Sequence, residues 1–283
     1  MNLMHEKAFA GDTFTKSFQV KSIRNTSDGN HSVIHFTCEL INQRGRVCMT
    51  ADKRMLFEFS MPESSVTSTR KEGEDPFSTN RLFRDHLLSK AESLSEIGSQ
   101  SLASLIPGQL IFHQMSRSLT FSQSQQLASL ARLTHPRHFD CRKYNEKTEI
   151  LIPGGLVLGI ATSASSRDLH EILHEELLSC SYVNVLHPGD TVSGMTYVKH
   201  VDENIPGDLE SIVVRTIAVK NIDLVKESNA AGLPVELFVG NAKYSRDIEQ
   251  ICKLYCPQLS NKIVVQFDRK ILRQTSKKQM FLL

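Results

Sequence analysis

His170, Glu171 and His174 form the pattern His-Glu-x-x-His, whose residue types and spacing fit a known chemistry. On a helix, two imidazoles one turn apart can bind Zn²⁺ while the glutamate activates water, as in metalloproteases. Such a site needs a third ligand, and the downstream residues 181–191 are typical of strand and turn, with His187 as the conceivable ligand. We therefore expect no metal site. The pattern is better explained as the end of an amphipathic helix with an apolar stripe of Leu169, Ile172, Leu173, Leu177 and Leu178.

Six cysteines are a second set of possible ligands, but their spacing is uninformative. Cys252 and Cys256 could share a helix face, and C-x3-C without further ligands is weak evidence for a metal. A chain of 283 residues can bury a sizeable core without disulfides. We interpret the six as free thiols in a reducing cytoplasm.

Composition argues against several classes of partner. The chain is 40% hydrophobic and 23% charged with a net charge of +2, which gives no reason to expect nucleic acid or an anionic membrane surface. The first twelve residues carry charges where a signal peptide needs an apolar run. The most apolar stretch, 150–164, is shorter than the roughly 20 residues that span a bilayer. We expect a cytoplasmic protein without nucleic-acid or membrane partners.

An internal repeat organises the chain. GDTFTKSFQVK (11–21) and GDTVSGMTYVK (189–199) match at Gly, Asp, Thr, Val and Lys, and each opens a meander of apolar strands. The meanders end alike, in Asp52-Lys-Arg and Asp268-Arg-Lys. Before the second turn lie more than 80 residues with strand and helix signals, but only ten precede the first. We predict a strands-only partial repeat (1–60), a linker (61–104) and a complete domain (105–283).

The elements of the complete domain follow from its patterns. Residues 105–120 predict a hairpin, and 122–136 a helix capped by Ser122 and ended by Pro136. Residues 155–178 predict a long helix, so apolar at its start that a sheet should wrap around it. Strands follow from 181, and the insert between Lys220 and Lys262 contains one helix at 245–255. An antiparallel sheet wrapped around a central helix is an α+β, hot-dog arrangement, here an incomplete double hot-dog.

Four segments carry a family resemblance. HPRHFD (135–140), GGLVLGIA (154–161), VNVLHPGDTV (183–192) and VVRTIAVKN (213–221) resemble the MaoC-like hydratases. The chain is most similar to 2-methylfumaryl-CoA (mesaconyl-CoA) hydratases, which are double hot-dog proteins. The resemblance covers roughly 105–275 as one hot-dog and 8–59 as the back half of another, including a match at Asn42-Gln43-Arg44-Gly45.

The resemblance implies hydration of an enoyl-CoA thioester, or dehydration of a 3-hydroxyacyl-CoA, with no cofactor beyond the CoA of the substrate. It assigns stabilisation of the thioester oxygen to backbone N–H groups at Gly154 and Gly155. A helix start offers unpaired donors and a positive dipole end, and glycine lets a ligand approach the backbone.

The resemblance also implies the acid–base residues, where this sequence departs from the family. His138 and Asp140 match the end of the hydratase motif, but the Asp or Asn expected five residues before the histidine is Leu133. His135 is the candidate substitute, because Pro136 could turn its ring into the same cleft. The alternative is that His135 and His138 are polar residues beside a degenerate site.

Three functions are therefore possible: a hydratase, a non-catalytic hot-dog subunit that binds acyl-CoA, and an acyl-CoA thioesterase. Arg137 could bind substrate, and with Arg215 and Lys220 could contact CoA phosphates, although solvated surface charge also explains all three. We expect a homodimer, because the first repeat lacks the helix that would cover its sheet.

Overall fold

The computed structural model describes residues 2–3, 8–65, 85, 87–89, 105–169, 172–205, 209–240 and 244–274. The chain divides into two compact units, Met1–Leu88 and Ser89–Leu283. The linker expected over 61–104 falls mostly outside the described residues. Within the described part of the chain, no helix is long and apolar enough to cross a membrane.

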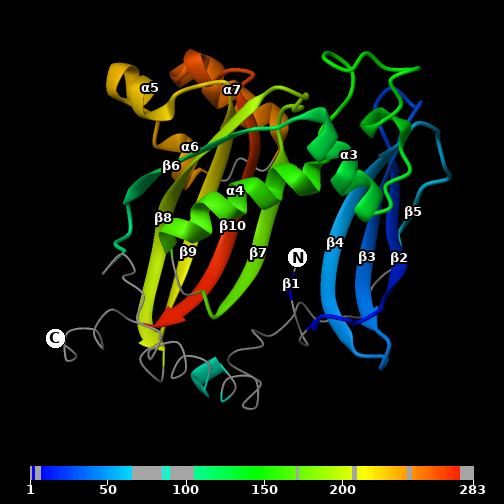
Figure 1. Cartoon of the computed structure of the whole chain (residues 1–283), viewed down its shortest axis with the longest axis horizontal. Coiled ribbons are helices and arrows are strands. Elements are labelled where there is room, and N and C mark those ends of the chain that lie inside the picture. The colour runs from blue at the N-terminus through cyan, green and yellow to red at the C-terminus, as the bar shows by residue number, and fades with distance from the viewer. Residues whose placement is uncertain are drawn as a thin grey trace. The chain divides into compact units, whose positions relative to one another are not determined.

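The first unit is an antiparallel sheet dominated by three long strands (Figure 1). Its strand order is β1-β4-β3-β2-β5. The strands are β1 (Asn2–Leu3), β2 (Phe14–Asn25), β3 (Ser32–Asn42), β4 (Val47–Phe57) and β5 (Ser64–Ser65).

The second unit is a sheet of five antiparallel strands with helices on it, in the order β6-β8-β9-β10-β7. Its strands are β6 (Leu110–Ser118), β7 (His174–Tyr182), β8 (Thr191–Ile205), β9 (Leu209–Lys220) and β10 (Ile263–Gln274). Its helices are α3 (Phe121–Leu130), η1 (Pro136–His138), α4 (Gly154–Leu169), α5 (Leu224–Ala231), α6 (Glu236–Val239), α7 (Ser245–Tyr255) and η2 (Pro257–Leu259).

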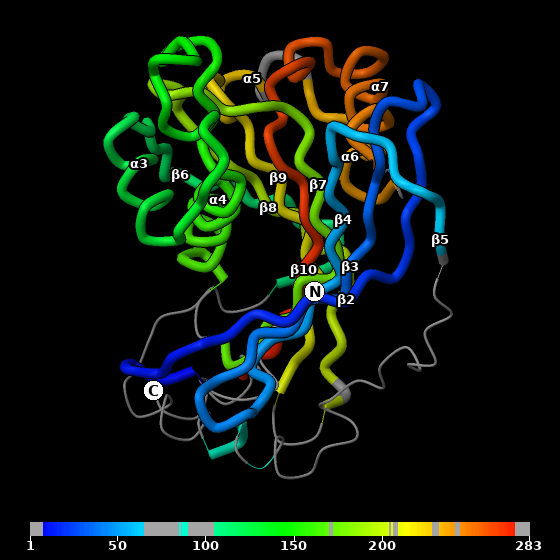
Figure 2. Tube along the Cα trace, turned by 90° about the vertical axis from the view of Figure 1, so that its right-hand side faces the viewer, coloured from blue at the N-terminus to red at the C-terminus, as the bar shows by residue number. Residues whose placement is uncertain are grey.

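Helix α4 is the central helix of this unit and lies across the strands (Figure 1). Its buried residues recur at helical spacing, from Val157 to Leu169. Leu169 joins a core cluster with the alternate residues Ile212 and Val214 of β9. The other face of the sheet is covered by the insert, where Leu237, Phe238, Ile248 and Cys252 join a second core cluster with Ile217. Figure 2 shows α4 and α7 on opposite sides of the strands. The sheet is therefore buried on both faces.

The turns that open the two repeats have the same geometry. Gly11 and Gly189 have φ angles of 91° and 94°, in the left-handed region that favours glycine. Asp12 accepts the N–H of Phe9 (2.9 Å), and Asp190 accepts that of His187 (2.9 Å). A side-chain amide from the next strand's end bridges each turn: Gln43 donates to Asp12 (2.7 Å) and Asn221 to Asp190 (2.6 Å).

The strands repeat as closely as the turns. The register shifts between Val20 and Ser22 in β2, and at the matching place between Val198 and His200 in β8. The lysine in each bulge reaches the matching aspartate: Lys21 contacts Asp52 (2.8 Å) and Lys199 contacts Asp268 (3.3 Å). The predicted repeat is therefore confirmed at the level of backbone register and ion pairing.

Several expected element boundaries were wrong. Residues 105–120 contain one strand, β6, because Pro107 and Gly108 form a turn before it. Helix α3 is capped by Thr120 in a reciprocal bond with Gln123, not by Ser122, and ends at Leu130. The helix expected over 155–178 ends at Leu169, and His174–Tyr182 instead pairs with β10. The insert has α5 and α6 besides the expected α7.

Candidate functional site

The segment that leads into α4 is held on both sides. The N–H of Leu151 donates to the carbonyl of Arg137 (2.9 Å), and the N–H of Ile152 donates to that of Leu186 (2.9 Å). The Pro153 carbonyl then accepts the first helical N–H bond, from Leu156 (2.9 Å). The N–H groups of Gly154 and Gly155 have no acceptor among the described residues. Two free donors therefore lie at the positive end of the α4 dipole.

His138 ends η1 beside this segment and is half-buried. Its Nδ1 is 2.9 Å from the carbonyl oxygen of Leu151. Because a carbonyl only accepts, this contact assigns the proton of the neutral ring to Nδ1. Nε2 then carries a lone pair and is a possible base.

His135, the exposed N-cap residue of η1, has the opposite tautomer. Its Nδ1 accepts the N–H of Arg137 (3.2 Å), which assigns the proton of the neutral ring to Nε2. The rings of His135 and His138 are 6.1 Å apart between centroids and inclined by 64°. The two rings thus lie near each other and have opposite tautomers.

Asp140 and Leu133, the other two positions of the predicted motif, differ in polarity and in their contacts. Both carboxylate oxygens of Asp140 accept N–H bonds from the Arg142 guanidinium (2.9 and 3.0 Å), and these bonds lower the pKa of Asp140. Leu133 is 36% exposed and has no polar side-chain atom. Asp140 is therefore engaged with Arg142, and Leu133 brings no polar group to the site.

The three suggested basic residues differ in their access to solvent. Arg137 is exposed, and its guanidinium lies 5.8 Å from the Tyr144 ring, so it can still bind an anion. Arg215 is buried and held by both carboxylate oxygens of Asp268 (2.7 and 2.9 Å). The idea that Arg215 contacts a CoA phosphate was therefore wrong. Lys220 donates to the Val185 carbonyl (2.6 Å).

The two glycines at the start of α4 have different surroundings. A Cβ atom on Gly154 would lie 2.9 Å from Cε1 and from Cζ of Tyr182, so this space is filled by the protein's own phenol ring. A Cβ on Gly155 would meet nothing within 4 Å. The space beside the Cα atom is therefore filled by Tyr182 at Gly154 and open at Gly155.

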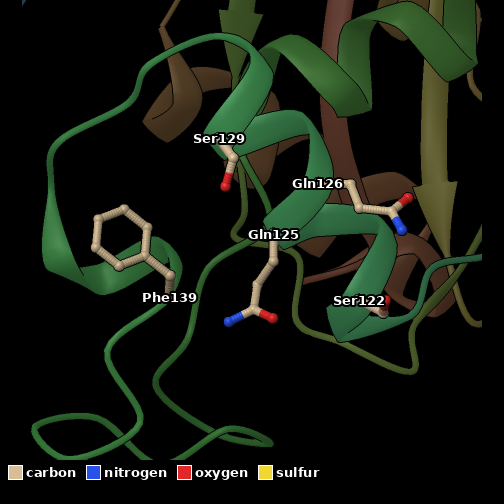
Figure 3. A pocket seen from close by; sticks show the side chains of 5 residues that line it. All are labelled: Ser122, Gln125, Gln126, Ser129 and Phe139. Atoms are coloured by element: carbon tan, nitrogen blue, oxygen red, sulfur yellow. The ribbon is translucent and has the colours of Figure 1, made fainter.

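An open hollow of about 630 Å³ adjoins this region. It is lined by Ser122, Gln125, Gln126 and Ser129 of α3 and by Phe139, which directly follows His138. Figure 3 shows the Phe139 ring opposite the Gln125 and Ser129 side chains. The lining is uncharged and offers amides, hydroxyls and one aromatic face.

Comparison with known proteins identifies the fold. No protein-family model matches the chain, and no curated protein does. Among solved structures, a similar one comes from Chloroflexus aurantiacus and is described as a MaoC domain dehydratase. The match covers 97% of this chain and 76% of that one, at 18% identity and a TM-score of 0.69. A conserved protein of Mycobacterium tuberculosis described as having a double hot-dog fold matches with a TM-score of 0.59 and 14% identity, over 96% of this chain and 72% of that one.

The chain has an incomplete double hot-dog fold. This confirms the fold class predicted from the sequence, with α4 as the central helix of the second hot-dog. A chain described as a MaoC-like dehydratase matches too, with a TM-score of 0.52 and 13% identity, over 96% of this chain and 73% of that one. At such identities the likeness concerns the fold, and the similarity to mesaconyl-CoA hydratases in particular stays a prediction.

The second half of α4 covers a network of buried polar side chains that was not predicted from the sequence. His113 contacts Asp168 through Nδ1 and the Thr196 hydroxyl through Nε2 (2.7 Å). Thr196 contacts Thr216 (2.8 Å), and Ser165 of α4 lies within 3.3 Å of both hydroxyls. The only sequence signal was a histidine in an otherwise apolar strand, LIFHQ.

An arginine ends this network. Arg269 donates to Ser165 (2.5 Å) and to Glu175 at the start of β7 (2.8 Å). The contacts run from Thr196 through His113 to Asp168, the order of nucleophile, base and carboxylate in a catalytic triad. However, the Thr196 and Ser165 side chains are fully buried, so no substrate can reach these hydroxyls. The network therefore fixes α4 on the hot-dog sheet.

The zinc pattern of the sequence is not on one helix. Helix α4 ends at Leu169, and His174 is the first residue of β7. His170 and Glu171 lie outside the described residues. Within the described ranges no three His, Cys, Asp or Glu side chains cluster as metal ligands. The expected lack of a zinc site stays a prediction.

Proposed function

We propose that this protein adds water to an enoyl thioester, or removes water from a 3-hydroxyacyl thioester. The observation that carries the proposal is the His138 imidazole. Its Nδ1 is held by the Leu151 carbonyl, its Nε2 lone pair is available, and the segment it contacts leads directly to the free N–H groups of α4. Hydration needs a positioned base and oxyanion stabilisation, and we assign these roles to His138 and to the N–H groups at the start of α4.

The proposed step uses one imidazole for both proton transfers. His138 Nε2 takes a proton from water while the water oxygen bonds to C3 of the enoyl group. The electron pair of the C2=C3 bond moves toward C2, and the thioester oxygen gains charge that the N–H groups of Gly154 and Gly155 stabilise. His138 then returns the proton to C2, which completes the addition of one water and restores the neutral ring.

His135 positions the water in this scheme. Its Nε2–H can donate to the water oxygen, since the two rings are 6.1 Å apart and carry opposite tautomers. In the dehydration direction the same N–H stabilises the departing hydroxide. His135 thereby takes over the orienting role that a carboxylate at position 133 would have.

The identity of the carrier that bears the thioester is the least specific part of the proposal. The exposed Arg137 and the uncharged hollow beside Phe139 suit an arm with amides and a terminal phosphate, as in CoA. The reaction needs no cofactor of the protein's own, because CoA arrives with the substrate.

The test is removal of the base. His138→Ala should lower kcat/KM for a short enoyl-CoA by about 10²–10⁴-fold, the usual effect of one proton-transfer group. His187→Phe is the matched control, because His187 makes the same Nδ1 contact with the Ile150 carbonyl (2.8 Å), and Phe9 takes its place in the first repeat. Equal loss in both variants, with folding intact by circular dichroism, would contradict the role of His138.

A second candidate function is a non-catalytic subunit that binds acyl thioesters. It is favoured by one observation: Leu133 stands where a carboxylate is expected, and Asp140 is engaged by Arg142. Calorimetry showing acyl-CoA binding by a wild-type protein that turns over neither enoyl- nor 3-hydroxyacyl-CoA would select this candidate.

A further inference from the structure

Tyr182 packs its ring against Gly154, the first residue of α4. It ends β7, where its backbone pairs with Val265 of β10. Its ring fills the space beside Gly154: the positions of Cζ and the hydroxyl oxygen are 2.9 and 3.3 Å from where a Cβ would be. The side chain is nevertheless 49% exposed. The ring thus contacts the start of α4, although half of the residue's surface is exposed.

The phenol keeps its proton at neutral pH. Partial burial raises the pKa of Tyr182 above its ordinary value, and burial raises the pKa of the neighbouring Cys180 thiol to about 11. The hydroxyl interacts with the Cys180 thiol, which is a weak hydrogen-bond acceptor. An oxygen of higher charge density would compete well for this O–H donor.

We propose that Tyr182 contacts the substrate thioester and donates its O–H to the developing oxyanion, beside the N–H groups of Gly154 and Gly155. This inference rests on the proposed function and adds a third donor to it. The β7–β10 pairing uses the backbone, and packing on Gly154 uses the ring. Neither requires the hydroxyl, so the hydroxyl can be tested separately from the fold.

Tyr182→Phe is the direct test, because it removes the hydroxyl and keeps the ring. We expect kcat for enoyl-CoA hydration to fall by about 10²- to 10³-fold, the range for one oxyanion donor, with KM changed less than about threefold. The affinity for a saturated acyl-CoA, measured by calorimetry, should not change. Tyr255→Phe is the matched control, since Tyr255 lies on α7 and is also half-exposed.

Gly154→Ala tests the ring contact independently. The added Cβ must displace Tyr182, so kcat should fall in the wild-type background and fall much less in a Tyr182→Ala background. A Tyr182→Phe enzyme with wild-type kcat would overturn the inference, and if His138→Ala still loses activity the proposed function stands. Wild-type protein without any hydratase activity would overturn both.

Discussion

At the scale of single residues, two histidines of one short 3₁₀ turn have opposite tautomers. His135 Nδ1 meets an N–H, while His138 Nδ1 meets a carbonyl. The sequence predicted that the two rings would be close, because Pro136 fixes the turn between them. The tautomers could not be predicted, because the Leu151 carbonyl comes from a segment that only the folded chain brings near. The contact between Tyr182 and Gly154 is equally non-local.

Position 133 offers a gain-of-function prediction. Leu133→Asp should raise kcat/KM if a water-orienting carboxylate is what limits the site. Because Leu133 is 36% exposed, the carboxylate stays partly hydrated, so the melting temperature should fall by only a few degrees. Leu130→Asp, at an 82% exposed position of α3, is the control and should leave the activity unchanged. Equal activity of Leu133→Asp and wild type would show that a carboxylate at position 133 is not the missing group.

At the scale of elements, the end of α4 shows why local patterns misled. HEILHEELL has helical spacing, yet residues 174–182 form β7 because pairing with β10 satisfies their backbone and Glu175 binds Arg269 (2.8 Å). Arg269 is far away in the sequence, so no local window contains this information. Helix α7 was predictable because its own amphipathic pattern and the flanking Pro257 suffice.

The network under α4 predicts a pH dependence of stability. Burial lowers the pKa of His113 below its ordinary 6.5, an effect that its contact with Asp168 only partly offsets. Near and below pH 6.5 the unfolded chain therefore binds more protons here than the folded protein. This contribution to stability is full above pH 6.5 and is lost as the pH falls through the lower folded pKa.

Denaturant unfolding at pH 7 and pH 5 tests this. The free energy of unfolding should be lower at pH 5 than at pH 7 in the wild type, and this difference should be smaller in His113→Gln, whose side chain cannot be protonated. His31→Gln, at a half-buried position directly after the β2–β3 turn, should keep the wild-type pH dependence. The same slope in all three proteins would show that His113 is not the responsible group.

At the scale of the whole molecule, comparison of the two repeats explains why one face of the first sheet exposes apolar side chains. Counted from the matching glycines, Phe18 corresponds to Thr196, whose hydroxyl touches α4 in the second unit. Phe18, Phe36 and Phe57 form a row of aromatic contacts, 6.2 and 6.3 Å between centroids, on the face equivalent to the one α4 covers. Phe18, Val20 and Met55 on this face are 54%, 38% and 36% exposed. The strand pattern of the sequence predicted a sheet without a covering helix, but it did not predict which surface packs on that sheet.

We expect this apolar face to be buried in a homodimer, because exposed contiguous apolar surface favours association. Light scattering at micromolar concentration should give the mass of two chains, and Phe18→Ser with Met55→Ser should shift the mass toward one chain. A monodisperse wild-type monomer would contradict this expectation.

The central claim is that this hot-dog protein adds water across the C2=C3 bond of an enoyl thioester. The most direct measurement is incubation of the wild-type protein with a short enoyl-CoA in ¹⁸O-labelled water, followed by mass spectrometry of the products. We predict that the product is a 3-hydroxyacyl-CoA, which carries the label on its hydroxyl group and keeps its CoA. The His138→Ala variant should not form this labelled product. Free CoA with a labelled carboxylic acid would identify a thioesterase instead, and recovery of unchanged enoyl-CoA would contradict catalysis altogether.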